Sequence, residues 1–218
     1  MNITKRANNK INYSNRKKPN SDFMNKDLRR SNCFSCDFSN SNFNYTSFRG
    51  AQFKSCNFSE CTFDSAELIA TNLKNSRFKK VKFENTIFDS VNLDGVDFEG
   101  AEFKNVIFVA TDMSGARNLE LSNQDVKIFD TMPELAINIT LEKAAKSAMR
   151  NEFVKFARVL DTKDGKINPI AINRLLESFD EETLINGLRA MKLNVKEDLC
   201  TLNDVVKVIE GYKAQNLI

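Results

Sequence analysis

Residues 41–63 read SNFNYTSFRGAQFKSCNFSECTF, and phenylalanine returns in this stretch at every fifth position. The spacing continues in both directions without a slip over nineteen positions, which hold thirteen of the eighteen phenylalanines in this chain of 218 residues. A small or β-branched residue stands two positions before each of them, except at Lys26. The apolar positions are Phe23, Leu28, Cys33, Phe38, Phe43, Phe48, Phe53, Phe58, Phe63, Leu68, Leu73, Phe78, Phe83, Phe88, Leu93, Phe98, Phe103, Phe108 and Met113.

A period of five residues fits neither an α-helix nor a straight β-strand. Five helical residues rotate by about 500°, so the phenylalanines would be scattered around the helix. In a strand they would alternate between the two faces, because the side-chain period is two. The chain must therefore turn once in every five residues, always in the same direction. Coils of this kind stack into a solenoid with ladders of apolar side chains inside it.

The units SNFNY, TSFRG, AQFKS, VNLDG, VDFEG and AEFKN resemble the pentapeptide-repeat family, whose pattern is A-(D/N)-(L/F)-x-x. The resemblance covers residues 21–117 and implies a right-handed quadrilateral β-helix with four units in each coil. We therefore expect an all-β solenoid of about 4.75 coils, in which residues twenty positions apart stack on one another. The two phenylalanine columns expected in its core are Phe23, Phe43, Phe63, Phe83 and Phe103, and Phe38, Phe58, Phe78 and Phe98.

Four of the five cysteines, Cys33, Cys36, Cys56 and Cys61, fall on inward positions of this pattern. We expect them to pack as small apolar thiols. A Cys36–Cys56 disulfide stays open as an alternative, because these two residues would be stacked. A zinc site is the least favoured interpretation, because Cys33 and Cys36 lie on different walls and the chain has no histidine. Reduced thiols favour a cytoplasmic location.

Charge is unevenly distributed along the chain. The net charge is +6 over residues 1–20, +3 over residues 21–80 and −5 over residues 81–115. We expect residues 1–20 to form a disordered basic tail, and they lack the apolar segment of a secretory signal. The candidate acidic surface consists of Glu84, Asp89, Asp94, Asp97, Glu99 and Glu102.

Aliphatic side chains gather at outward positions on one wall of the expected solenoid. Clustered exposed aliphatic residues usually mark a contact surface. Three occupants stay open: the chain's own C-terminal segment, a second copy of the chain in a homodimer, and another protein. The candidate contact wall consists of Ile69, Ile87, Ile107 and Val109.

The five-residue repeat ends at Arg117, and helical patterns follow. Residues 118–130 are expected to form a linker, and residues 131–218 a small all-α bundle of four helices. Each predicted helix start combines a capping residue with an early proline or acidic residue. These starts are Thr131-Met132-Pro133-Glu134, Asn168-Pro169, Asp180, and Thr201-Leu202-Asn203-Asp204.

The segment LDTKDGKINP, residues 160–169, resembles a degenerate EF-hand loop with Gly165 at its sharp turn and Ile167 at its pairing position. Leu160 and Thr162 stand where acidic ligands belong, and Ala171 stands in the place of the bidentate glutamate. Because calcium takes six to eight oxygen ligands, we expect no calcium site in this loop.

The sequence predicts a binding function and no catalysis, metal or cofactor. The absence of histidine excludes Ser-His and Cys-His catalysis, and no phosphate-binding loop is present. We predict a non-enzymatic protein-binding module or scaffold that binds neither nucleic acid nor a membrane directly. The resemblance implies an alternative, since some pentapeptide-repeat proteins mimic duplex DNA. They bind a type II topoisomerase, either gyrase or topoisomerase IV, and protect or inhibit it. Such mimicry needs a strongly acidic rod, and only the final coils qualify.

Overall fold

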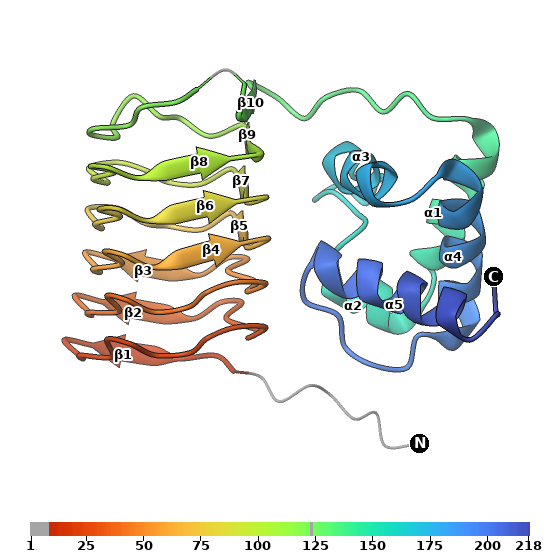
Figure 1. The fold of residues 1–218 in the computed structure, drawn as a ribbon, viewed down its shortest axis with the longest axis horizontal. Coiled ribbons are helices and arrows are strands. Elements are labelled where there is room, and N and C mark those ends of the chain that lie inside the picture. The colour runs from red at the N-terminus through yellow and green to blue at the C-terminus, as the bar shows by residue number, and fades with distance from the viewer. Residues whose placement is uncertain (1–8, 123) are drawn as a thin grey trace. The chain divides into compact units, whose positions relative to one another are not determined.

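The computed structural model describes residues 9–122 and 124–218, which form two units. A β-solenoid extends to Thr131, and a helical unit begins at Met132. The all-β solenoid followed by an all-α unit is the fold class that the sequence predicts. Figure 1 shows the solenoid as a stack of coils running from β1 to β10.

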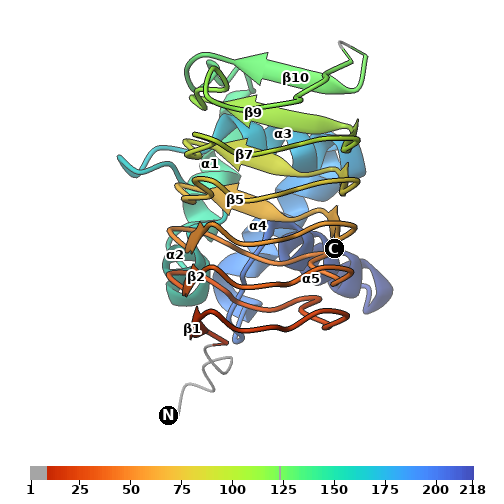
Figure 2. The same cartoon turned by 90° about the vertical axis from the view of Figure 1, so that its left-hand side faces the viewer.

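Parallel strands line the solenoid, and each pairs with a strand twenty residues away, as Phe63 pairs with Phe83. There are about six coils. The strands form three sheets, ordered β1-β2-β3, β4-β6-β8 and β10-β9-β7-β5, and the strands of the last sheet run across the view in Figure 2. The strands are β1 (Asn12–Ser14), β2 (Asn32–Phe34), β3 (Gln52–Lys54), β4 (Thr62–Asp64), β5 (Glu67–Ile69), β6 (Lys82–Glu84), β7 (Ile87–Asp89), β8 (Glu102–Lys104), β9 (Val106–Val109) and β10 (Val126–Phe129).

The Asp or Asn at the second position of many units holds a tight turn. The side-chain oxygen of Asn42 accepts a hydrogen bond from the backbone N–H of Asn44 at 3.0 Å. Asn72 and Asn92 likewise accept a hydrogen bond from the backbone N–H of the residue two positions later. A short polar side chain is suited to this bond. Units with a different residue at this position, such as Thr62 in β4, are often extended strands instead. The preference of the motif for Asp or Asn at its second position therefore has a local cause, the hydrogen bond within the turn.

The corner that ends each unit requires a left-handed backbone conformation. At the fifth position Asn40 has a φ of 56° and Gly100 a φ of 67°. Glycine has no Cβ to clash in this region, and asparagine tolerates it better than most residues. Because the corner recurs every five residues, the chain keeps turning in one direction and the ladders stay in register.

Stacked aromatic rings fill the core, as the twenty-residue spacing predicts. Ring centroids in one column lie 5.1 Å apart for Phe43 and Phe63 and 5.2 Å apart for Phe63 and Phe83. In the other column Phe58 and Phe78 are 4.8 Å apart. These separations lie within the range of favourable aromatic pairs. The ladders of both columns are therefore continuous.

Buried hydroxyl and thiol groups line the core beside the rings, and they donate to backbone carbonyls. The hydroxyl of Ser76 donates to the carbonyl of Phe53 at 2.7 Å, and the thiol of Cys61 donates to the carbonyl of Phe38 at 3.1 Å. A buried polar group costs little free energy when it is hydrogen-bonded. Small polar residues can therefore alternate with phenylalanine inside the solenoid.

The solenoid is longer at both ends than the predicted residues 21–117. The predicted disordered tail is wrong for residues 9–20, which belong to the first coil and include β1; residues 1–8 lie outside the described residues. Tyr13 keeps the five-residue spacing, but Lys18 occupies the next core position and hides the period. The predicted linker at residues 118–130 contains β10, which pairs with β9 as the last coil. This explains why about six coils replace the predicted 4.75.

The helical unit contains five helices rather than the predicted four. They are α1 (Ile139–Ala148), α2 (Glu152–Ala157), α3 (Pro169–Ser178), α4 (Glu181–Asn194) and α5 (Leu202–Ala214). The predicted first helix is divided, because the side chain of Asn151 accepts from the N–H groups of Phe153 and Val154 and starts a new helix. The predicted start at Thr131 is wrong, since Asn138 caps α1. The starts at Asn168, Asp180 and Thr201 are confirmed.

Two residues make close contacts between helices of this unit. A Cβ placed on Gly187 of α4 would lie 2.8 Å from two side-chain carbons of Ile209 in α5, so only glycine permits this approach. The side-chain amide of Asn151 donates to the carbonyls of Lys192 and Val195 at the end of α4. The start of α2 is therefore tied to the end of α4.

Candidate functional site

The candidate acidic surface is largely neutralised by lysines stacked next to it. Lys74 Nζ lies 2.6 Å from Asp94 Oδ2, and Lys104 Nζ lies 2.6 Å from Glu84 Oε1. Lys79 pairs with Glu99 and lies 3.7 Å from Asp97. Each of these pairs except Lys79–Asp97 joins residues twenty positions apart. Four of the six predicted acidic residues thus have a lysine partner.

The pairing follows from the charges of adjacent coils. Residues 71–90 contain five basic and two acidic residues, a net charge of +3, and residues 91–110 contain one basic and four acidic residues, a net charge of −3. A net charge counted along the chain separates these two segments, but the solenoid stacks them. The charges counted along the sequence did not reveal this compensation. It could have been found by looking for opposite charges twenty positions apart.

The two other predicted acidic residues lie apart from the lysine pairs. Asp89 ends β7 and accepts a hydrogen bond from the hydroxyl of Ser90 at 2.9 Å. Glu102 begins β8 and is exposed, and its neighbour in the ladder is Lys82. A basic residue therefore lies beside Glu102 as well.

Asp97 is the most enclosed of the six candidate acidic residues, with its side chain 11% exposed. A hydrogen bond from the side-chain amide of Asn118, 2.8 Å from Asp97 Oδ1, is the main reason why its pKa lies below the ordinary value of 3.8. Burial opposes this shift, whereas the N–H of Glu99 and the charge of Lys79 add to it. Asp97 is therefore a charged structural residue that joins the last two coils.

The candidate contact wall lies on the sheet β10-β9-β7-β5, but its four residues do not form one continuous column. Ile87 and Ile107 are direct neighbours in β7 and β9. Asp89 lies between Ile69 and Val109 in the adjacent column. Ile69 is half-buried, whereas only 7% of Ile87, 4% of Ile107 and none of Val109 is exposed. The apolar part of the wall is therefore concentrated on β7 and β9.

Phe129 extends this wall and was missed by sequence reasoning. It pairs with Val109 across β10 and β9 and is half-buried. Its position twenty residues after Val109 would have placed it on the same wall. We expected a linker here instead, because the repeat pattern breaks between Asn118 and β10.

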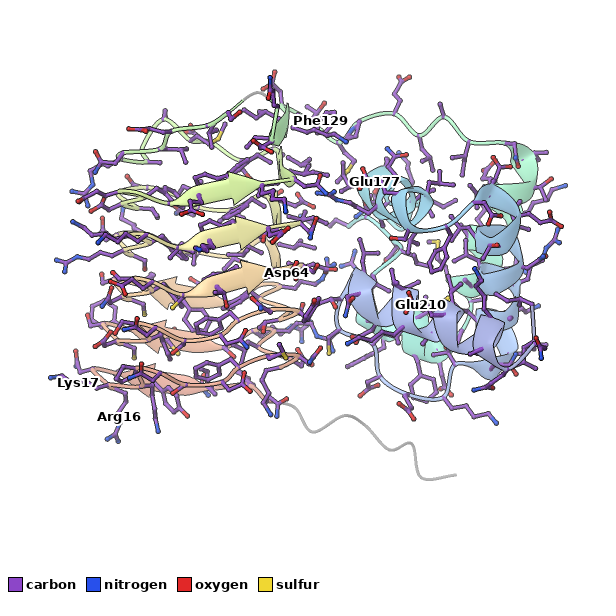
Figure 3. All side chains as sticks on the ribbon, viewed as in Figure 1. Arg16, Lys17, Asp64, Phe129, Glu177 and Glu210 are labelled. Atoms are coloured by element: carbon purple, nitrogen blue, oxygen red, sulfur yellow. The ribbon has the colours of Figure 1, made fainter. Side chains whose placement is uncertain are left out.

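A polar cluster on the β4–β6–β8 side was also missed. The hydroxyl of Tyr45 donates to Asp64 Oδ2 at 3.0 Å, and the amide of Asn85 donates to Asp64 Oδ1 at 3.1 Å; Figure 3 labels Asp64 at the edge of the solenoid. The bond to Asp64 raises the pKa of Tyr45 above 10.0. A tyrosine held in its protonated form supports a structural role for this cluster.

All five cysteines are buried thiols, so the Cys36–Cys56 disulfide is not formed. Burial is the main cause that raises the pKa values of Cys33, Cys56 and Cys61 to about 12. Only the thiolate is a good nucleophile or metal ligand. Within residues 9–122 and 124–218, no group of three or more cysteine or acidic side chains is arranged to hold a metal ion.

The carboxylates of the predicted degenerate EF-hand loop are engaged by neighbouring side chains. Asp161 Oδ2 lies 3.2 Å from Arg158 Nε, and Asp164 Oδ2 lies 3.1 Å from Lys166 Nζ. A bridge between Asp161 and Ile167 closes the loop on itself. The loop therefore connects α2 to α3 with its charges already compensated.

Residues 26–108 match the family described as the pentapeptide repeat region. No curated protein sequence matches the chain significantly. No helix of the described residues is both long and apolar enough to cross a membrane.

Several solved structures are similar over about half of the chain. The pentapeptide repeat protein Rfr23 from the cyanobacterium Cyanothece 51142 is 13% identical with a TM-score of 0.37, covering 54% of this chain and 84% of that chain. HetL from Nostoc, involved in heterocyst differentiation regulation, is 21% identical with a TM-score of 0.29, covering 56% and 52%. The fluoroquinolone resistance protein QnrB1 is 13% identical with a TM-score of 0.26, covering 56% and 88%.

Proposed function

Since residues 26–108 of this chain are a pentapeptide-repeat region within a longer solenoid, we propose that the protein is a non-enzymatic binding module or scaffold for a protein partner. The observation that carries the proposal is the ladder itself. Each outward side chain stands beside the one twenty residues away, held there by hydrogen bonds between coils such as Phe53 N–H to Asn72 O at 2.8 Å. A surface ordered in this way loses little conformational entropy when it binds.

The chemistry of the side chains supports binding rather than catalysis. The chain has no histidine. Thiols with a pKa of about 12, such as Cys56, are protonated at neutral pH and cannot act as nucleophiles. The carboxylates of Asp94 and Glu84 are paired with lysines.

Within this proposal, Ile69 is the residue of the candidate contact wall that a partner can reach, because Ile87, Ile107 and Val109 are buried. Ile87 and Ile107 point away from the phenylalanine ladders and lie side by side on neighbouring strands. Ile69, at the edge of the wall and half-buried, is the position at which a substitution perturbs the solenoid least.

The proposal is tested by affinity capture from the cells that produce the protein, with the wild type, Ile69→Ser and Phe34→Ser as baits. Phe34 is the matched control, because it is 49% exposed and lies on a different sheet. A partner retained by the wild type and by Phe34→Ser, but lost with Ile69→Ser, supports the wall as the binding surface. Equal capture by all three baits would exclude the wall. A wild-type bait that captures no specific partner would contradict the binding module.

A second candidate is a DNA mimic that binds gyrase or topoisomerase IV and protects or inhibits it. The observation that favours it is the excess of acidic residues over residues 81–115. The lysine pairs weaken it, because Lys74, Lys79 and Lys104 reduce the negative potential that a mimic of duplex DNA must present. A gyrase supercoiling assay with a fluoroquinolone decides the question. Protection or inhibition that disappears when the exposed Asp94 and Glu99 are changed to lysine would replace the first proposal with this one.

A further inference from the structure

Both ends of the solenoid are edges of parallel strands. Inside the stack, the N–H of Asn32 donates to the carbonyl of Ile11 and the N–H of Arg117 donates to the carbonyl of Val96, each twenty-one residues earlier. In the first coil no described carbonyl accepts from the N–H of Asn12, because no described coil precedes it. Neighbouring coils exchange hydrogen bonds in both directions, since the N–H of Phe23 donates to the carbonyl of Asn42 and the N–H of Asn42 donates to the carbonyl of Ser21. Each end therefore presents donors and acceptors with which a further coil could pair.

The exposed core residues at the two ends also match in their position. Tyr13 in the first coil and Met113 in the last coil belong to the same interior column, and both are partly exposed. Ile128 ends another interior column and is 48% exposed, although the corresponding Phe108 one coil earlier is buried. The apolar interior is therefore left open at the β10 end, where a further coil would cover it.

The charges of the two end coils are opposite. Residues 11–30 contain six basic and two acidic residues, a net charge of +4, and residues 111–130 contain two basic and four acidic residues, a net charge of −2. Arg16, Lys17 and Lys18 are all exposed, and Figure 3 shows Arg16 and Lys17 projecting from the β1 end. The exposed acidic residues of the last coil include Glu120, Asp125 and Asp130.

We propose that copies of this chain stack head to tail, with the β1 end of one solenoid on the β10 end of the next. Like charges oppose contact between two β1 ends or between two β10 ends, whereas unlike ends attract each other. Lysine and arginine at a sheet edge also prevent indiscriminate pairing with uncharged strands. Because the two contacting surfaces differ, the contact is open-ended and produces short linear oligomers rather than a closed dimer.

The test is sedimentation velocity of the full chain over a range of protein concentrations. We expect the weight-average sedimentation coefficient to rise continuously with concentration beyond the value for a dimer. Raising the salt from about 0.05 M to about 0.5 M should weaken association by about tenfold or more, because exposed charges are screened. A monomer at every concentration, a closed dimer, or association that salt does not weaken would each overturn the proposal.

Charge reversal at one end identifies the surfaces involved. The first variant carries Arg16→Glu, Lys17→Glu and Lys18→Glu, and the second carries Glu120→Lys, Asp125→Lys and Asp130→Lys. Each variant alone has ends of one sign and should be monomeric, whereas an equimolar mixture should associate again. The matched control changes three exposed lysines of the helical unit, Lys143, Lys155 and Lys163, to glutamate.

The equimolar mixture of the two variants distinguishes a loss of charge complementarity from a loss of folding. Recovered association in the mixture shows that both variants are folded at their ends, and circular dichroism of each variant alone checks the remainder. Association of either end variant alone, failure of two folded variants to associate when mixed, or loss of association in the control would contradict head-to-tail stacking.

Discussion

Replacing Phe63 by alanine should destabilise the solenoid by about 4 kcal/mol. The ring is 1% exposed, and the ring centroids of Phe43, Phe48, Phe58, Phe78 and Phe83 all lie between 5.1 and 5.9 Å from it. Burial of the side chain contributes about 2–3 kcal/mol. The cavity left among five rings adds the remainder, because coils above and below hold those rings in place.

Phe23 is the matched control for this substitution, since it occupies the same column at the end of the ladder. It is only partly buried, and two rings contact it, Phe43 at 4.8 Å and Phe38 at 5.7 Å. With solvent on one side the cavity can fill, so Phe23→Ala should cost about 1–2 kcal/mol. The prediction is therefore a difference of about 2–3 kcal/mol between two chemically identical substitutions.

The assay is urea denaturation with pulsed thiol labelling and mass spectrometry. Cys33, Cys36, Cys56 and Cys61 are buried in the solenoid, whereas Cys200 is buried in the helical unit. Labelling therefore reports the unfolding of the two units separately. The Phe63→Ala midpoint should fall for the four solenoid cysteines and stay unchanged for Cys200. Equal costs at Phe23 and Phe63, or a cost below about 1 kcal/mol at Phe63, would refute the ladder as the source of stability.

Three further predictions follow from the same structure. Gly187→Ala should destabilise the helical unit by about 1–3 kcal/mol, because the new methyl group collides with Ile209. Gly211→Ala should be neutral or stabilising, because nothing beyond the backbone of its own helix lies within 4 Å of its Cβ position. Thermal unfolding measures both variants, and equal effects would contradict the close approach at Gly187. Cys56 and Cys61 should resist iodoacetamide in the native protein at pH 8, since burial raises their pKa values to about 12; modification as fast as that of a free thiol would show that the coils open readily. The pKa of Asp97 lies below 3.8, chiefly because of its bond from Asn118, so its stabilising effect is present above the unfolded pKa and is lost as the pH falls through the lower folded value. The melting temperature should therefore decline below about pH 4, less steeply in Asp97→Asn, and an unchanged slope in that variant would exclude this carboxylate as a cause.

The repeat could be recognised from the sequence because it is a local code. Each unit needs an apolar centre, a small residue two positions before it, and a residue that tolerates positive φ at its corner, as at Asn40. These requirements act within five residues, so the stacking of Phe43 on Phe63 could be predicted by counting twenty positions. The same counting failed at the ends. There Lys18 and the segment after Asn118 depart from the pattern, because an end coil has a neighbour on one side only and tolerates polar residues.

The helix starts show the same limit inside the second unit. Asn168 and Asp180 follow the usual capping patterns, and their helices begin as predicted. Asn151 caps α2 in the middle of an apolar pattern that reads as one long helix. Its amide also binds carbonyls at the end of α4, more than forty residues away. Periodicity describes one helix face at a time and carries no information on such a distant partner.

The sequence alone determined the solenoid, its register of twenty and the burial of the phenylalanine columns, because backbone geometry and burial repeat identically in every unit. Only the tertiary structure decided the electrostatics of the surface. Asp94 and Glu99 read as an acidic patch along the chain, but Lys74 and Lys79 stand beside them in the preceding coil. Coulomb energy depends on distance in space rather than along the chain. The electrostatic potential at each carboxylate is therefore set by the residue that stacks next to it.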